Sequence, residues 1–149
     1  MAQVRCEVTG VFVAAGETAA APVVVLADSS GRKLPIFIGI TEAISIESAF
    51  QHETLPRPFT HDLFIELLTR FSIALSSLKI DSMQDGVYYA QLVLRDETRE
   101  EDIDCRPSDG IAIALRAYVP IYVDESLLSR DGNAADLPAL ISLSTFLAR

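Results

Sequence analysis

The sequence has 149 residues, half of them hydrophobic, which is enough for one compact domain with a buried core. No apolar run approaches the roughly 18 residues that a membrane helix needs, and the first residues lack a signal-peptide pattern, so we expect a cytoplasmic protein that binds no membrane. The net charge of −9 argues against strong nonspecific binding of nucleic acid, because such binding depends on many Lys and Arg contacts to phosphate. Any such binding must come from a few locally concentrated cations or from recruited metal ions.

The first half of the chain alternates strand-like and helix-like segments, with turn-forming residues between them. The expected strands cover residues 4–14, 22–27 and 33–38. Pro35 places the third of these at a sheet edge, because proline cannot donate a backbone hydrogen bond. The expected helices cover residues 42–51 and 60–71, and the second has the clearest amphipathic pattern of the chain.

The second half repeats this plan. The expected strands cover residues 74–82, 87–94, 103–105 and 120–123. Helices are expected to begin at Ser108 and Ser126, and a C-terminal helix over residues 137–147 follows a polar break at 130–136. The repeated order of strands, hairpin and helix suggests an internal duplication. It predicts a single α+β domain with a mostly antiparallel or mixed sheet and helices packed on it.

Three of the expected helices begin with a hydroxyl residue that is followed by an acid. The hydroxyl residues, which can cap a helix by accepting a bond from a free amide of the first turn, are Thr41, Thr60 and Ser108. The acids, which favour the positive end of the helix dipole, are Glu42, Asp62 and Asp109. If the chain is duplicated, Glu42 and Asp109 lie at related positions.

Residues 105–117 are the most informative stretch, and they predict a strand end, a tight corner and the start of a helix. Pro107 fixes its own backbone and pushes Arg106 toward extended geometry. Gly110 and the alanines after it would let the helix lie close against a sheet. The corner therefore presents Arg106, Ser108 and Asp109 beside free backbone donors.

These residue types suit metal-assisted hydrolysis of phosphodiesters. Convergent carboxylates can hold divalent ions, an Arg can bind phosphate through two hydrogen bonds, and a His can transfer protons. The spacing of the acids matches no metal motif. The sequence also has no glycine-rich phosphate loop and no nucleophile elbow, which disfavours a serine or cysteine nucleophile.

A purely structural interpretation of each residue stays open. An acid in a first helical turn can act only as a dipole partner, and Arg106 can simply pair with Asp109 or Asp104. His61 can be only a capping or exposed residue. Cys6 and Cys105 have neither disulfide nor metal-ligand spacing, and we expect them to be small buried strand residues.

The chain resembles the bifunctional nuclease domain family. The matching segments are residues 34–39 with Glu42 and Ala43, residues 57–63, residues 85–92, and the Arg106-Pro107-Ser108-Asp109 corner through residue 123. The resemblance implies a family core at about 4–128 with a helical extension at 129–149, an α+β fold that is often oligomeric, and activity on both RNA and DNA. The polar motif residues that it implies are Glu42, Arg57, Thr60, His61, Asp62, Asp85, Arg106, Ser108 and Asp109.

Two functional hypotheses follow. In the first, the protein is a nuclease that uses Mg²⁺ or Mn²⁺: the metal ligands are Glu42, Asp62 and Asp109, the catalytic residues are His61, Asp62 and Asp109, and the residues that bind RNA or DNA are Arg57, Arg106 and Ser108. In the second, it is a non-catalytic binding or regulatory module. Its acidic charge and the absence of a recognisable active-site motif favour this alternative. We expect a homo-oligomer.

Overall fold

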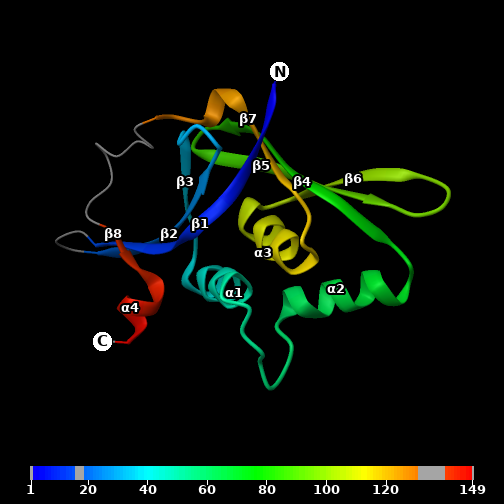
Figure 1. Cartoon of the computed structure of the whole chain (residues 1–149), viewed down its shortest axis with the longest axis horizontal. Helices are drawn as coiled ribbons and strands as arrows, with labels where there is room; N and C mark the ends of the chain where they lie inside the picture. Colours follow the sequence, from blue (N-terminus) through cyan, green and yellow to red (C-terminus); the bar gives the residue numbers. More distant parts are fainter. Residues whose placement is uncertain (1, 16–18, 131–139, 149) are drawn as a thin grey trace.

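The computed structural model describes residues 2–15, 19–130 and 140–148 (Figure 1). The strands are β1 (Gln3–Ala15), β2 (Ala20–Ala27), β3 (Lys33–Phe37), β4 (Ala74–Gln84), β5 (Val87–Arg95), β6 (Glu100–Cys105), β7 (Ile121–Asp124) and β8 (Leu140–Ser142). The helices are α1 (Ile40–Phe50), α2 (Thr60–Arg70), α3 (Pro107–Ala117) and α4 (Leu143–Leu147), with a short 3-10 helix, η1 (Glu125–Leu127). These elements confirm the α+β prediction.

The strands form one mixed sheet in the order β3-β2-β1-β7-β4-β5-β6, with β8 added to β1. Within the described strands, β4 and β7 run parallel and the other neighbours run antiparallel. Pro35 lies on β3, which is an edge strand as predicted. The order of three strands followed by a helix occurs twice, as β1–β2–β3–α1 and as β4–β5–β6–α3. None of the described helices is long and apolar enough to cross a membrane.

Helix α3 lies in the middle of the molecule, with α1 and α2 beside it (Figure 1). Its residues Ile111, Ala112 and Ala114 are fully buried in the core. Gly110 lets the helix approach the sheet closely, because an added Cβ atom there would overlap the Leu78 side chain and lie 3.1 Å from Cys105 Sγ. The small residues of this stretch therefore bring the corner at Arg106 tightly against the sheet, as the sequence predicts.

The predicted helix caps are wrong. Thr41, Thr60 and Ser108 lie inside their helices, and the capping positions are Gly39, Phe59 and Arg106, whose backbones are extended. For α3 the reason is Pro107, because proline prefers the first helical position and so moves the boundary back to Arg106. For α2 the backbone amide of Phe59 donates to Asp62 Oδ2 at 2.8 Å. Asp62, and not Thr60, therefore supplies the side-chain oxygen that binds a free amide at this helix start.

The predicted C-terminal helix is partly wrong. Residues 140–142 form β8, which pairs with Phe12 to Ala14 of β1, and the helix begins only at Leu143. β1 pairs with β7 through Gln3–Cys6 alone. Without β8, the backbone groups at the far end of this side of β1 would be unpaired. β8 satisfies these groups. Residues 137–139 and most of the predicted polar break lie outside the described residues.

Candidate active site

The three predicted acids share one position, the third residue of a helix. They are Glu42 of α1, Asp62 of α2 and Asp109 of α3. Asp62 binds the amide of its own capping residue, and the Glu42 carboxylate lies so close to the Cα of Gly39 that an added Cβ would overlap it. Each of these acids therefore lies at the positive end of a helix dipole, as predicted. Asp62 differs from the other two in its further contacts.

Arg106 joins the starts of α1 and α3. Its Nε donates to Asp109 Oδ2 at 2.8 Å, and its Nη2 donates to both Asp109 Oδ1 at 3.2 Å and Glu42 Oε1 at 3.3 Å. The Arg106 side chain is still 65% exposed. The tertiary structure thus brings Glu42 and Asp109 to one guanidinium group that faces solvent.

His61 links Asp109 to α1. Its Nε2 lies 2.9 Å from Asp109 Oδ1, and its Nδ1 lies 2.6 Å from Ser45 Oγ. Since an ionised carboxylate can only accept, we assign a ring proton to Nε2, and in this tautomer Nδ1 accepts from the Ser45 hydroxyl. Both ring nitrogens are therefore occupied, and the ring is only 14% exposed.

Arg116 forms a second centre, which includes Ser45 and Asp62. Its Nε donates to Asp62 Oδ1 at 2.7 Å, its Nη2 donates to the carbonyl and hydroxyl oxygens of Ser45, and its Nη1 donates to the carbonyl oxygen of Ala112. Only 8% of this side chain is exposed. Arg116 therefore ties α1, α2 and α3 together.

Ser45 and Arg116 were not predicted. Ser45 lies between Ala43 and Ile46 on the buried face of α1. A polar residue on such a face needs hydrogen-bond partners, and this feature of the sequence could have identified Ser45. The order Ser45–His61–Asp109 matches a nucleophile, base and orienting acid. Ser45 Oγ, however, is buried and already accepts from Arg116 while it donates to His61. We therefore interpret Ser45 as a residue that positions His61.

Hydrogen bonds and charged neighbours keep Asp109 and Asp62 ionised. Burial works to raise the pKa of Asp109, but hydrogen bonds from Arg106 and His61 outweigh burial, and the pKa lies below its ordinary value. The pKa of Asp62 is also lowered: burial acts upward, and the bonds from Arg116 and the Phe59 amide act downward more strongly. The hydrogen bond to Asp109 raises the pKa of Arg106. At neutral pH the site therefore holds carboxylates and a charged guanidinium.

Two cavities meet at Arg106 and Glu42. The first, of about 380 Å³, is lined by these residues with Ser45, His61 and Asp109, and by apolar side chains of α1 and the start of α2. The second, of about 500 Å³, extends from the same two residues toward the end of β3 and the β4–β5 hairpin. The exposed guanidinium therefore stands between two hollows, each large enough for part of a ligand.

The predicted set of three metal ligands is not brought together. Over residues 2–15, 19–130 and 140–148, no three His, Cys, Asp or Glu side chains form a group that could hold a metal ion. Asp62 binds Arg116, whereas Glu42 and Asp109 converge on the same nitrogen of Arg106. Mg²⁺ commonly uses one or two carboxylates and completes its shell with water and substrate phosphate. Glu42 and Asp109 fit that pattern.

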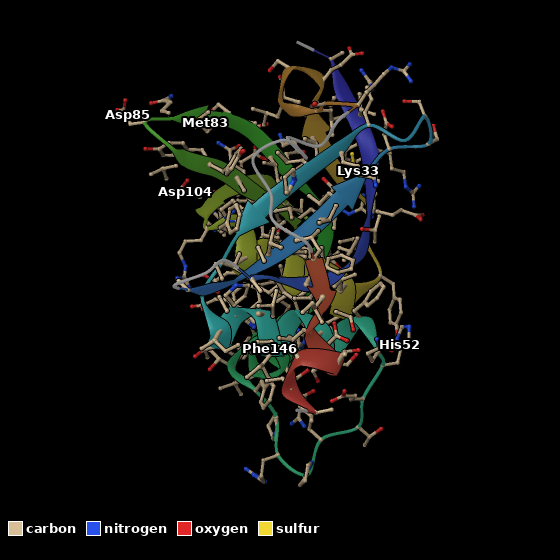
Figure 2. The ribbon with its side chains drawn as sticks, turned by 90° about the vertical axis from the view of Figure 1, so that its left-hand side faces the viewer. Lys33, His52, Met83, Asp85, Asp104 and Phe146 are labelled. Carbon is tan, nitrogen blue, oxygen red and sulfur yellow. The ribbon has the colours of Figure 1, made fainter. Side chains whose placement is uncertain are left out.

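Among the described residues, Arg57, Ser108 and Asp85 form no hydrogen bond with this cluster. Arg57 is exposed on the connector between α1 and α2 and lines neither of the two cavities. Ser108 is buried and lines the second cavity. Asp85 occupies the tip of the β4–β5 hairpin, which stands out from the body of the molecule in Figure 2. Its φ of 53° and the φ of 79° at Gly86 are those of a tight hairpin turn, which gives Asp85 a structural role.

Comparisons with known proteins show which family the chain resembles. The sequence model of the Bifunctional nuclease domain matches residues 24–136. An uncharacterized protein of Mycobacterium tuberculosis is 42% identical over 112 residues, which cover 74% of this chain and 66% of that protein. Bifunctional nuclease 1 of Oryza sativa subsp. indica is 32% identical over 70% of this chain, and Bifunctional nuclease 2 of Oryza sativa subsp. japonica is 30% identical over 86% of it. The matches span only 33% and 41% of these two rice proteins.

Proposed function

Because the chain belongs to the bifunctional nuclease domain family, we propose that it hydrolyses phosphodiester bonds of RNA and DNA where α1, α2 and α3 begin. The observation that carries this proposal is the exposed Arg106, held by Glu42 and Asp109 at the junction of two cavities. Two acids and an arginine that face a hollow suit metal-assisted phosphodiester hydrolysis, because carboxylates can hold a divalent ion and an arginine can bind phosphate.

Arg106 is the proposed phosphate ligand. It is the only Lys or Arg among the described residues that line the two cavities. Its contacts to Glu42 and Asp109 use Nε and Nη2, and within the described chain no hydrogen bond involves Nη1. This nitrogen can bind a phosphate oxygen while the carboxylates hold the rest of the guanidinium in place.

Asp109 and Glu42 are the proposed metal ligands, and Asp62 is not. Mg²⁺ or Mn²⁺ bound there would neutralise phosphate charge and supply an activated water. His61 donates to Asp109 from Nε2 and so fixes the carboxylate that faces the cavity. A direct role of His61 in proton transfer requires its bond to Ser45 or to Asp109 to open. The proposed roles of Ser108 and Arg57 in substrate binding rest on the family resemblance.

The second candidate function is a non-catalytic oligomeric module. Leu63, Leu67 and Phe71 form a stripe along α2 with a spacing of four residues, and each is more than half exposed. An apolar stripe of this kind is commonly buried between subunits. Both candidate functions are compatible with a homo-oligomer, and a cleavage assay separates them.

The test uses purified protein with labelled single-stranded RNA and DNA, first with Mg²⁺ or Mn²⁺ and then with a chelator. We expect metal-dependent cleavage that falls at least about 100-fold in Arg106→Ala, which removes the phosphate ligand, and in Asp109→Asn, which removes a carboxylate ligand of the metal. Arg70→Ala is the matched control, since Arg70 is an exposed arginine of α2 paired with Glu66. Absence of cleavage, or equal rates in all variants, would contradict the proposal.

A further inference from the structure

The second cavity continues directly from the proposed phosphate ligand. It shares Arg106 and Glu42 with the first cavity, and its far walls come from the end of β3 and the start of β5. Its volume of about 500 Å³ lies in the range of pockets that bind small organic groups. A group covalently attached to a phosphate at Arg106 can therefore enter it.

The walls of this cavity are mainly apolar and partly aromatic. Phe37 and Val87 are 54% and 55% exposed although they line a hollow, and Tyr88 stands beside them. The polar groups are Arg106, Glu42 and Ser108, and they lie together at the end where α1 and α3 begin. An exposed Phe a short way from a phosphate ligand forms a surface on which a flat base can stack.

The charges of the protein disfavour the usual way of binding a duplex. Duplex binding relies on many Lys and Arg contacts to phosphates, whereas the lining of the two described cavities has Arg106 alone and the chain carries a net charge of −9. Beyond the single phosphate at Arg106, further affinity must therefore come from contacts other than phosphate. Base faces supply such contacts, and they are accessible only where the bases are unpaired.

We propose that the second cavity is a nucleobase pocket, with Phe37 as its stacking surface, and that the substrate is single-stranded nucleic acid. This inference rests on the proposed function and names its substrate class. The phosphate binds Arg106 and the adjoining base lies against Phe37 and Val87, while duplexes, whose bases are stacked on one another, are excluded.

The first measurement is steady-state cleavage of one labelled oligonucleotide, single-stranded or annealed to its complement. We expect cleavage of the single strand and at least about 10-fold slower cleavage of the duplex. Phe37→Ala should raise KM for the single strand roughly tenfold with little change in kcat, in keeping with the loss of one stacking contact. Tyr118→Ala is the matched control, because Tyr118 is an exposed aromatic residue just after α3, outside this cavity, and the change should leave KM unchanged.

The second measurement is binding of the same oligonucleotides by fluorescence anisotropy in chelator, where no cleavage is expected. Phe37→Ala should weaken binding of the single strand, and Tyr118→Ala should not. Cleavage that depends on Arg106 but is equal for duplex and single strand, or is unchanged in Phe37→Ala, overturns the pocket and leaves the proposed nuclease standing. Binding that depends on Phe37 without any cleavage supports the pocket and overturns the nuclease. Absence of both overturns the pocket.

Discussion

Two arginines of the α3 region each bind an acid at a helix start, and they differ chiefly in exposure. Arg106 pairs with Asp109 and Glu42, and Arg116 pairs with Asp62. In both cases the arginine holds the pKa of its Asp partner below the ordinary value, against the effect of burial. Yet Arg106 is 65% exposed and Arg116 only 8%. Pairs with the same chemistry are therefore open to solvent in one place and closed to it in the other.

The acceptors around each arginine explain the difference. Arg116 donates to the backbone carbonyl oxygens of Ser45 and Ala112 as well as to Asp62, so its position is set by three helices. Arg106 is held by carboxylates alone among its described partners. An exposed arginine can bind a ligand through a nitrogen that its carboxylates leave unused, whereas removal of a buried arginine leaves polar groups without partners.

The largest expected effect on stability comes from Arg116. Arg116→Met should lower the free energy of unfolding by about 2–3 kcal/mol, because Asp62 and the carbonyl oxygen of Ser45 lose a buried charged donor. Arg106→Met, the matched change at the exposed pair, should cost less than about 1 kcal/mol. Urea denaturation of both variants measures the two values. Equal losses would contradict the division into a structural and a binding pair.

An intermediate effect is expected from Asp62, and it depends on pH. Because the pKa of Asp62 is lowered in the folded protein, its ion pair adds stability above the unfolded pKa of about 4 and loses it as pH falls through the lower folded pKa. Asp62→Asn should therefore cost about 1 kcal/mol at pH 7, a value that allows for solvent screening, and much less near pH 3. Denaturation at a series of pH values tests this, and a cost that stays constant down to pH 3 would be inconsistent with the ion pair.

The smallest effect is expected from Ser45. Ser45→Ala should lower the free energy of unfolding by about 0.5–1 kcal/mol, because Arg116 keeps the Ser45 carbonyl oxygen as an acceptor. Loss of the bond to His61 Nδ1 should shift the pH profile of kcat, which a purely structural role would not change. Ser48→Ala is the control on the same buried face of α1. An unchanged pH profile would show that Ser45 does not act through His61.

Much of the fold could be predicted from the sequence, because the signals are local. Alternating patterns and short apolar runs placed β1 to β5 and β7, and Asp85-Gly86 predicted the turn between β4 and β5. The apolar and small residues of 105–117 predicted the corner and the close packing of α3. The motif around Arg106 also predicted the family, which the comparisons confirm. Each of these depends on neighbouring residues and their backbone preferences.

Only the tertiary structure decided which charged side chains meet. Arg106 and Glu42 are 64 residues apart in the chain, and Arg116 and Ser45 are 71 apart. Local sequence signals treat Glu42, Asp62 and Asp109 alike, since each is an acid in a first helical turn. The packing of α1 and α2 against α3 sends Asp62 to the buried Arg116 and leaves Glu42 and Asp109 with the exposed Arg106. Such pairings depend on how the helices pack, and no local preference encodes that arrangement.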